Sequence, residues 1–406
     1  MPPPDTGSSP SCITIEKLVY GGDALSRVNG QVLLVPFALP GEEVEVTTAR
    51  AKGKILRGFN PRVVSTSPHR VQPACEYFGR CGGCHYQHAE YDYQLEQKAA
   101  ILRETLTRLG RITLDDNIPI LSAEPWQYRN RIQLHFDRRN LGFLEMGSQK
   151  LCPVTHCPIS SPKLNTVIAA LNQAVTRPEW PAFLRGLEIF TNESDVQLNV
   201  TDSSRPLAAR FFSWCAELIP GFQPTSINYE VLGQTFRISR GTFFQVNRFL
   251  IEKLVDEVTG PYAGDTAIDL YAGAGLFSLP LAKRFRSVVA VERNTAAHRD
   301  LEYNASPYQG VITAIQSPGE EFLEQLSETP DLIVADPPRP GLTRSVSSRL
   351  LAVQPPKIVV VSCDPATLAR DLETLTRSYQ IRRVALIDLF PQTFHFETVV
   401  HLELKR

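Results

Sequence analysis

Residues 269–277 read DLYAGAGLF, and this stretch decides how the carboxyl-terminal part of the chain folds. An apolar run precedes it and a helical pattern follows it. Glycines at such a position let the backbone approach a ligand at the carboxyl end of a parallel strand. Three further apolar runs lead through polar residues into helical patterns, at 287–292, 331–336 and 357–362. The sequence therefore predicts an α/β domain from about residue 236 onward, with a doubly wound, mostly parallel sheet.

The glycine turn differs from a dinucleotide-binding motif. Gly273 and Gly275 are followed by Phe277 and Ser278, so the third glycine of that motif is missing. Glu292 closes the second strand, where a carboxylate can bind both hydroxyls of a ribose. An adenosyl group without phosphates fits these residues better, and we expect S-adenosylmethionine as the cofactor. The alternatives are a plain tight turn for the glycines and a solvated acid for Glu292.

Three residues near strand ends are candidates for chemistry. Asp336 begins the sequence DPPR, in which Arg339 replaces the aromatic residue that ends similar motifs of amino-methyltransferases. Cys363 follows a strand just before a helix, where a cysteine can be a reactive thiolate. A small buried cysteine is the alternative. Glu397 lies in an apolar stretch, where an acid is either hydrogen-bonded or kept at a raised pKa for proton transfer.

A nucleophilic cysteine, a carboxylate base and S-adenosylmethionine together define one reaction. C5 of a pyrimidine is too weakly nucleophilic to take a methyl group unaided. Attack of a thiolate at C6 makes C5 enolate-like, so that it can accept the methyl group. A base then removes the C5 proton and the thiol leaves.

The sequence resembles the RNA uracil-C5 methyltransferase family, specifically its iron–sulfur-containing ribosomal RNA branch, over nearly the whole chain. The stretches that match in order and spacing are 241–247, 269–277, 336–339, 362–371 and 395–399. The resemblance implies a Rossmann-like class I methyltransferase domain in which Cys363 is the nucleophile and Glu397 the base. It also implies four residues that bind S-adenosylmethionine, namely Gln245, Tyr271, Glu292 and Asp336. Two positions depart from the family pattern: Leu276 replaces a polar residue, and residues 316–317 lack an acid.

Clustered cysteines are the second feature with chemical meaning. The chain has eight cysteines, too few and too unevenly spaced for a secreted disulfide scaffold. Cys75, Cys81 and Cys84 are close in sequence, and Cys157 follows in the sequence HCPI. Such a set can hold a [4Fe–4S] cluster or a zinc ion. The family resemblance implies the [4Fe–4S] cluster, with these four cysteines as ligands.

The other cysteines are less informative. Cys152 is an alternative fourth ligand, whereas Cys12 and Cys215 are expected to be structural. We expect the cluster to stabilise the middle domain and shape an RNA surface rather than to carry out redox chemistry.

The N-terminal part of the chain is basic, although the formal net charge of the whole chain is only −1. Residues 11–66 contain short alternating strands and turns, which predict an OB-like β-barrel that resembles the TRAM RNA-binding domain. The adjoining stretch lacks acids between Val46 and Cys75 and contains Arg50, Lys52, Lys54, Arg57, Arg62 and Arg70. A second group mixes arginines with rings that could stack bases, and comprises Arg129, Arg131, Arg138, Arg139, Tyr128, His135 and Phe136. A solvated charged face is the alternative.

The expected organisation has four parts: a flexible tail at 1–10, a TRAM domain at 11–66, a central α+β iron–sulfur domain at 67–235 and a methyltransferase domain at 236–406. No signal peptide or bilayer-spanning run is visible, so we expect a cytoplasmic protein without a membrane partner. We also expect a monomer. The expected partner is RNA, with a uridine of 23S ribosomal RNA as substrate. The alternatives are the same chemistry on transfer RNA and a non-catalytic RNA-binding or assembly protein.

Overall fold

The computed structural model describes residues 11–50, 55–114, 117–137 and 139–406. The predicted tail at 1–10 therefore lies outside the described residues, as do Lys52, Lys54 and Arg138. The chain forms two compact units, each assembled from segments that are distant in sequence. Unit 1 comprises Met1–Ile101, Gly142–Val154 and Phe390–His395, and unit 2 comprises Leu102–Leu141, Thr155–Leu389 and Phe396–Arg406.

Unit 1 begins with a six-stranded sheet. Its strands are β1 (Ser11–Thr14), β2 (Lys17–Leu18), β3 (Asp23–Val28), β4 (Gln31–Pro36), β5 (Glu43–Arg50) and β6 (Leu56–Ser65). They lie in the order β1-β5-β6-β4-β3-β2, with antiparallel pairing except between β4 and β6. Ala24, Leu33 and Val44 are fully buried, because one face of the sheet covers the core. The predicted N-terminal β-domain is confirmed.

The remainder of unit 1 holds the first three clustered cysteines. A hairpin of β9 (Asn140–Leu144) and β10 (Leu151–Pro153) lies beside them. The Gly82 N–H donates to the Leu144 carbonyl (2.9 Å), and the Met146 N–H donates to the Arg80 carbonyl (3.0 Å). The loop that carries Cys75, Cys81 and Cys84 is thus joined to this hairpin by backbone hydrogen bonds. Helix α1 (Tyr91–Gly110) begins in this unit and ends in unit 2.

Unit 2 contains a smaller antiparallel region ahead of the large sheet. Its strands and helices are β8 (Arg131–Asp137), α2 (Pro162–Ala174), β11 (Leu184–Thr191), β12 (Val196–Ser203), α3 (Ala209–Leu218) and β13 (Phe222–Gln223). β8, β11 and β12 pair antiparallel, whereas β13 is parallel to β12. A separate hairpin follows, made of β14 (Ser226–Val231) and β15 (Gln234–Ser239).

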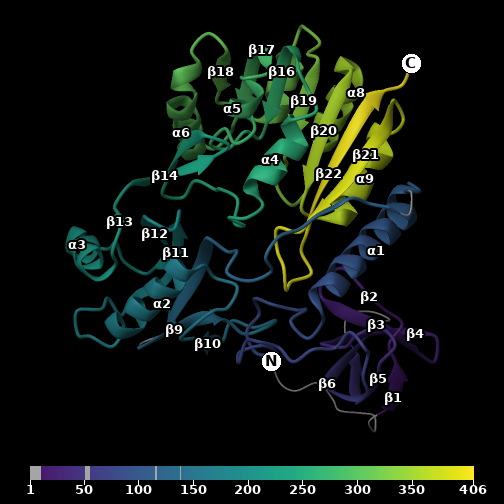
Figure 1. Ribbon diagram of the computed structural model, residues 1–406, viewed down its shortest axis with the longest axis vertical. Helices are drawn as coiled ribbons and strands as arrows, with labels where there is room; N and C mark the ends of the chain where they lie inside the picture. Colours follow the sequence, from purple (N-terminus) through teal and green to yellow (C-terminus); the bar gives the residue numbers. More distant parts are fainter. Residues whose placement is uncertain (1–10, 51–54, 115–116, 138) are drawn as a thin grey trace. The chain divides into compact units, whose positions relative to one another are not determined.

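The large sheet of unit 2 confirms the predicted α/β fold (Figure 1). Its strands are β7 (Ile120–Leu121), β16 (Gly264–Leu270), β17 (Phe285–Val291), β18 (Ile312–Ile315), β19 (Leu332–Ala335), β20 (Lys357–Ser362), β21 (Tyr379–Ile387) and β22 (Glu397–Leu404). They lie in the order β18-β17-β16-β19-β20-β22-β21-β7. The first five are mutually parallel, and β22 runs antiparallel to both its neighbours.

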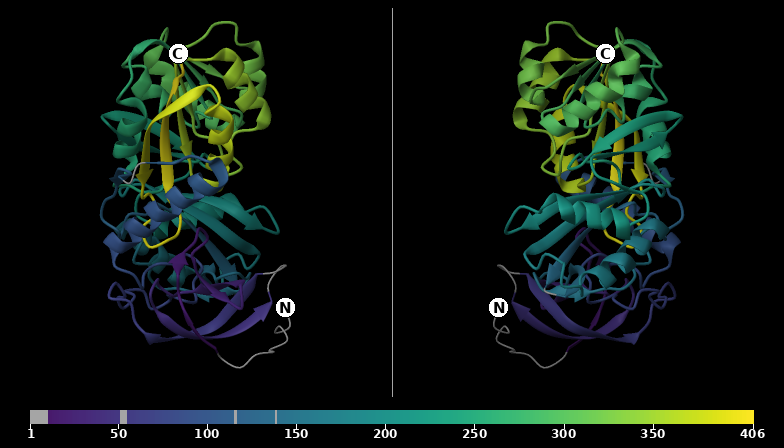
Figure 2. Two further views of the ribbon diagram at one scale, coloured as in Figure 1. Left: turned by 90° about the vertical axis from the view of Figure 1, so that its right-hand side faces the viewer. Right: turned by 90° about the vertical axis from the view of Figure 1, so that its left-hand side faces the viewer.

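Helices cover both faces of this sheet, as the two side views show (Figure 2). They are α4 (Ile251–Thr259), α5 (Ser278–Leu281), α6 (Thr295–Ala305), the short 3₁₀ helix η1 (Ser306–Tyr308), α7 (Gly319–Gln325), α8 (Arg344–Val353) and α9 (Pro365–Leu375). α4 contacts α5, whereas α7, α8 and α9 contact one another in turn. Strands buried on both faces read as continuous apolar runs, which is why the sequence revealed them. No helix among the described residues is both long enough and apolar enough to cross a membrane.

Candidate active site

The predicted site residues of unit 2 emerge at one edge of the large sheet. The register pairs Leu270 with Val291 on one side and with Ala335 on the other, and Ala335 pairs with Val360. The residues that follow these strands therefore meet at the carboxyl edge; among them are Tyr271, Glu292, Asp336 and Cys363. This edge is where open α/β sheets bind ligands.

The glycine turn after β16 has the backbone that its sequence predicted. Gly273 and Gly275 have φ values of +56° and +94°, which glycine adopts without strain. A Cβ on Gly275 would come within 3.0 Å of Leu301 on α6, whereas a Cβ on Gly273 would meet nothing within 4 Å. The Gly273 N–H donates to Glu292 Oε2 (2.9 Å). Gly275 is needed for close packing, and Gly273 leaves open space beside a carboxylate.

Carboxyl groups dominate this edge, and the sequence analysis missed one of them. Asp269, inside β16, is fully buried; its Oδ2 accepts the Ser278 hydroxyl (2.5 Å), and its Oδ1 has no hydrogen-bond partner among the described residues. Burial raises the pKa of Asp269 to about 7, despite the Ser278 hydrogen bond, and burial also raises the pKa of Asp336 to about 7. The acid in the apolar run AIDL was the available signal. Acceptors suit the hydroxyl and ammonium donors of S-adenosylmethionine and disfavour a pyrophosphate.

A buried carboxylate on α6 fixes the segment that leads to Gln245. Asp300 is fully buried and accepts hydrogen bonds from the Ser239 N–H (2.8 Å) and hydroxyl (2.6 Å), the Thr242 hydroxyl (2.8 Å) and the Arg237 guanidinium (3.0 Å). Gln245 follows three residues after Thr242 and is 5% exposed. Because one carboxylate accepts four hydrogen bonds, the segment 237–242 is held firmly against α6.

The same helix also contacts the glycine turn. Asn304 donates to the Ala274 carbonyl (2.9 Å) and to the Arg237 carbonyl (3.1 Å), and its side-chain oxygen accepts the Arg237 N–H (2.8 Å). α6 thereby links the glycine turn to the strand that precedes the Gln245 segment. Sequence reasoning missed Asp300 and Asn304, although polar residues four apart on the apolar face of a helix were the available signal.

Cys363 and Glu397 are brought together by the antiparallel strand. Ser362 at the end of β20 pairs with Thr398 of β22. In an antiparallel register the next pair is Cys363 with Glu397. The strand begins at Glu397 instead of covering the whole apolar stretch 394–399, so its first residue stands at the carboxyl edge of the parallel strands. Residues far apart in sequence thus become direct neighbours.

The charge states of this pair differ from the sequence expectation of a ready thiolate. Burial, together with the negative charges of Glu397, Asp336 and Asp364, raises the pKa of the Cys363 thiol to about 12, although Arg339 opposes these effects. The N-terminus of α9 is capped by Asp364, whose carboxylate accepts the N–H groups of Ala366 and Thr367 (both 2.9 Å). Because an anion already occupies the helix N-terminus, its dipole does little to stabilise a thiolate.

Glu397 is buried at the start of β22. Its side chain is 7% exposed, and burial together with the nearby Asp336 charge raises its pKa well above the ordinary value, while Arg339 lowers it. A raised pKa is what proton transfer near neutral pH requires. The pair can therefore add a thiol to an electrophilic carbon and accept a proton beside it.

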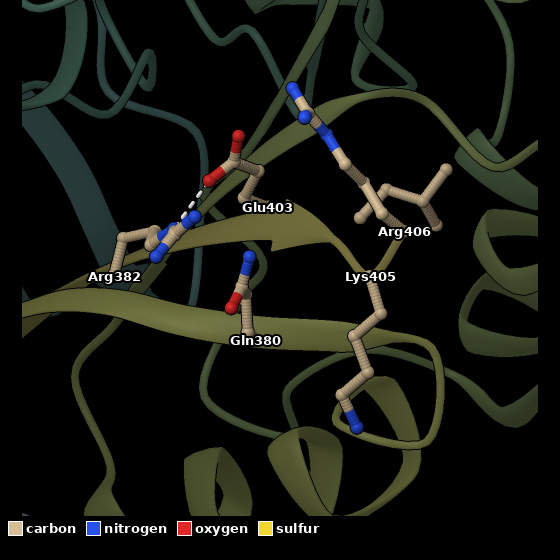
Figure 3. Close-up of a pocket in the computed structure, with 6 residues that line it drawn as sticks. Gln380, Arg382, Glu403, Lys405 and Arg406 are labelled. Atoms are coloured by element: carbon tan, nitrogen blue, oxygen red, sulfur yellow. Dashed lines mark hydrogen bonds and ion pairs between the residues drawn. The ribbon is translucent and has the colours of Figure 1, made fainter.

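A surface hollow of about 630 Å³ lies elsewhere on the large sheet (Figure 3). Its lining residues are Gln380, Arg382, Glu403, Leu404, Lys405 and Arg406. Arg382 forms an ion pair with Glu403, and Lys405 Nζ donates to the Thr376 carbonyl (2.6 Å). The hollow lies at the far end of β22 from Glu397, roughly 20 Å away at 3.3 Å per residue. It is separate from the predicted site.

The four predicted cluster cysteines are divided between the two units. Cys75, Cys81 and Cys84 belong to unit 1, and Cys157 belongs to unit 2. The Gly83 N–H donates to Cys81 Sγ (3.4 Å), and the Cys75 N–H donates to Gln87 (3.1 Å). Within the part of the chain that the structure describes, no group of three His, Cys, Asp or Glu side chains is arranged around a metal position. Thiolate sulfurs that accept backbone N–H groups are nevertheless suited to a cluster.

The remaining cysteines lie outside these loops. Cys152 is fully buried in β10, and burial raises its pKa. Cys215 is buried on α3, where burial raises its pKa to about 12, in keeping with a structural role. Cys12 is exposed on β1.

The predicted basic surface is smaller than its sequence suggested. Among the six basic residues of 50–70, Arg57 pairs with Asp23 (3.2 Å), Arg62 pairs with Glu45 (2.6 Å) and Arg70 pairs with the fully buried Glu42 (2.5 Å). These acids come from other parts of the chain, so the absence of acids within the stretch did not leave Arg57, Arg62 and Arg70 unpaired.

The second predicted RNA-binding group is wrong for its central members. Arg131 is 7% exposed, pairs with Glu188 (3.0 Å) and lies over the Phe190 ring. Tyr128 and Phe136 are buried in the core. Phe136 lies on the buried face of β8, which it shares with Ile132 and Leu134, whereas Arg131 at the start of the strand is buried through its contacts with Glu188 and Phe190. Only the outer members Arg129, His135 and Arg139 keep exposed surface among the described residues of this group.

A mostly parallel sheet, a glycine turn beside a strand-end carboxylate and a cluster of hydrogen-bond acceptors are features of a Rossmann-like enzyme that binds an adenosine-containing cofactor. Comparison with known proteins identifies the family within this class. Residues 325–405 match the family model tRNA (Uracil-5-)-methyltransferase, and residues 12–59 match the TRAM domain. The chain is 32% identical to an uncharacterized RNA methyltransferase of Aquifex aeolicus, with 98% of this chain and 99% of that one covered.

Two further relatives have named substrates. The chain is 32% identical to the 23S rRNA (uracil(1939)-C(5))-methyltransferase RlmD of Enterobacter sp. (strain 638), with 94% of both chains covered. The crystal structure of Pyrococcus abyssi tRNA (uracil-54, C5)-methyltransferase with S-adenosyl-L-homocysteine is similar at a TM-score of 0.78 and 26% identity, covering 97% of this chain and 100% of that one. The chain belongs to the RNA uracil-C5 methyltransferase family and carries out S-adenosylmethionine-dependent methylation of uracil C5 in RNA.

Proposed function

We propose that this enzyme methylates a specific uridine of 23S ribosomal RNA through a covalent adduct between Cys363 and C6. The observation that carries the proposal is the register of β20 with β22, which makes Cys363 and Glu397 neighbours at the carboxyl edge. Ribosomal RNA is favoured because the relative that acts on 23S rRNA is 32% identical, whereas the structure that acts on tRNA is 26% identical. Transfer RNA is the second candidate.

Each step can be assigned to a residue of this chain. Cys363 Sγ forms a bond to C6 as the thiol proton is lost to solvent, and the electron pair of the C5–C6 double bond becomes an enolate. S-adenosylmethionine, when bound, supplies the methyl group that C5 takes. The Glu397 carboxylate then removes the C5 proton, the double bond re-forms and the Sγ–C6 bond breaks. The target base has to leave its stack to reach the thiol, so an unpaired or flipped uridine is the substrate.

The cofactor would be held by Gln245, Tyr271, Glu292 and Asp336. Glu292 has the strongest support, because its carboxylate already fixes the Gly273 N–H and the Asn294 N–H (2.5 Å) beside the open space. Tyr271 has a φ of +66°, which directs the chain into the glycine turn.

Replacing Glu292 with glutamine is expected to raise the dissociation constant for S-adenosylmethionine about 10- to 100-fold, because a charged acceptor for ribose hydroxyls becomes neutral. Isothermal titration calorimetry measures this. Glu328→Gln, at an exposed acid of the same domain, is the matched control and should bind like the wild type. Equal affinity of both variants for S-adenosylmethionine would show that Glu292 does not bind the cofactor.

We propose in addition that Cys75, Cys81, Cys84 and Cys157 hold a [4Fe–4S] cluster whose role is structural. Three thiols in one backbone-paired loop, with an N–H directed at the Cys81 sulfur, support this. The loop around Cys157 is fixed in turn by Asn165, whose side-chain oxygen accepts the Cys157 N–H (2.9 Å) and whose amide donates to the Cys157 carbonyl (3.0 Å).

Cys81→Ser is expected to lose most of the bound iron and sulfide, the broad absorbance near 400 nm and RNA affinity, since a cluster ligand is missing. Chemical iron and sulfide analysis with RNA binding measures the effect. Cys152→Ser is the control for the alternative ligand. Full iron content, fold and RNA affinity in Cys81→Ser would contradict the proposal. Iron loss in Cys152→Ser would assign the fourth ligand to Cys152 instead of Cys157.

The proposed substrate is tested by mass-spectrometric mapping of 5-methyluridine in ribosomal and transfer RNA from cells with and without the gene. We expect one or more 23S positions to lose the modification. Loss confined to transfer RNA would select the second candidate. The division of the chain at 66/67 and 235/236, the monomeric state and a cytoplasmic location stay predictions.

A further inference from the structure

Four aromatic rings gather in unit 1 from three distant parts of the sequence. Phe394 meets the Tyr20 ring edge-on (5.2 Å between centroids), the His85 ring edge-on (4.7 Å) and the His395 ring at 3.9 Å. Tyr20 also contacts His395 (6.2 Å). We call these four residues the ring cluster. All four residues are half-buried.

The ring cluster is firmly supported on its TRAM side. Tyr20 precedes Gly21 and Gly22 in the turn that leads into β3. Gly22 has a φ of +93°, and a Cβ there would lie 2.7 Å from the His85 ring. The turn can thus lie directly against the imidazole only because residue 22 has no side chain.

The segment Phe390–His395 is held in unit 1 by a reciprocal set of hydrogen bonds. The Gln392 carbonyl accepts the N–H groups of His85 (2.9 Å) and Tyr86 (3.0 Å). The Gln392 N–H donates to Gln94 Oε1 (3.1 Å), and Gln94 Nε2 donates to Gln392 Oε1 (3.0 Å). Gln392 is 3% exposed and has a φ of +67°, a conformation that a non-glycine residue keeps only when its surroundings fix it.

The chain itself limits how far the ring cluster can be from the chemistry. His395 precedes Glu397 by two residues, so their Cα atoms are at most about 7 Å apart. A base stacked on His395 would therefore belong to a nucleotide close to the one at Glu397. Aromatic side chains held on a fixed backbone are the usual platform on which unpaired bases of single-stranded RNA stack.

We propose that the ring cluster of Tyr20, His85, Phe394 and His395 is a stacking site for an unpaired nucleobase next to the target uridine. The proposal rests on the proposed function, because the uridine is placed by Cys363 and Glu397. Recognition of a neighbouring base would add to the selection of one uridine among many.

The test uses a single-stranded 20-nucleotide RNA copied from the segment around uridine 1939, the nucleotide named for the Enterobacter relative. 2-Aminopurine replaces the nucleotide on its 5′ or its 3′ side, and its fluorescence is quenched on stacking. We expect the wild-type protein to quench one of the two probes. His395→Ala should abolish this quenching and weaken binding about 5- to 150-fold, the range for one stacked base, whereas His395→Phe should retain both.

A matched RNA separates stacking from a merely structural role. An abasic nucleotide at the quenched position should bind wild type and His395→Ala with nearly equal affinity, because the base that distinguishes them is gone. Tyr303→Ala, at an exposed ring on α6, is the control and should bind both RNAs like the wild type. Quenching that persists in His395→Ala, or an equal loss of affinity on intact and abasic RNA, would overturn the proposal.

The same RNA with 5-fluorouridine at the target position keeps the two proposals distinguishable. Quenching without a covalent adduct would contradict the role of Cys363 and still support the stacking site. An adduct without quenching at either neighbour would support the proposed function and overturn the stacking site.

Discussion

Replacing Cys363 with alanine is expected to abolish methylation, with a loss of at least 10⁴-fold in the rate of 5-methyluridine formation. The reason is chemical: without the Sγ–C6 bond, C5 keeps the low nucleophilicity of an ordinary pyrimidine. Incorporation of the labelled methyl group from S-adenosylmethionine into RNA measures the rate. A denaturation-resistant adduct with 5-fluorouridine RNA should form with the wild type and be absent from Cys363→Ala.

Cys12→Ala is the matched control, because Cys12 is exposed on β1. It should keep wild-type methylation and adduct formation. S-adenosylmethionine affinity should be unchanged in both variants, which separates loss of the nucleophile from loss of the cofactor site. An adduct of wild-type yield in Cys363→Ala would assign the nucleophile to another residue.

Replacing Glu397 with glutamine is expected to slow turnover about 10²- to 10⁴-fold by a different route. Cys363 can still add to C6 and C5 can still take the methyl group, but the C5 proton has no acceptor. A covalent, methylated protein–RNA complex should therefore accumulate with ordinary uridine RNA. Gel electrophoresis under denaturing conditions, followed by mass spectrometry of the trapped nucleotide, detects it. Slow turnover without any trapped complex would show that Glu397 acts before methyl transfer.

The pH dependence of the same reaction follows from the raised pKa of Glu397. The group must be a carboxylate to remove the C5 proton, and burial keeps it protonated to a higher pH than an exposed glutamate. The turnover rate of the wild type should rise with pH through that raised pKa and level off above it. In Glu397→Gln this rise of the turnover rate with pH should be absent, because the glutamine side chain does not titrate.

The α/β half of the fold could be predicted because its signals are local. Each buried parallel strand is a continuous apolar run, and each site residue at the carboxyl edge directly follows such a run. The position of Glu397 could not be predicted from local signals. Its strand could be predicted, but its place opposite Cys363 depends on β22 running antiparallel beside β20. The residues of 397–404 do not indicate that β20 is the strand beside them.

The errors of the sequence analysis share one physical origin. Arg70 looked available for phosphate because no acid stood near it in sequence, yet it pairs with the buried Glu42, which lies 28 residues earlier. Arg131 was placed on an RNA surface, but it lies inside β8 and faces Glu188. Charge patterns along a chain report composition, and pairing across strands decides which charges remain for a ligand. Asp300 was missed for the related reason that its four donors come from another element.

The segment Phe390–His395 has a consequence for how the protein is made. Its hydrogen-bonding partners, Gln94 and the backbone of His85 and Tyr86, leave the ribosome some 300 residues earlier. Unit 1 cannot complete its set of contacts until nearly the whole chain has been synthesised. At roughly 5–20 residues per second, the amino-terminal part waits tens of seconds with Gln94 lacking its last partner. The domain made first is therefore among the last to be finished.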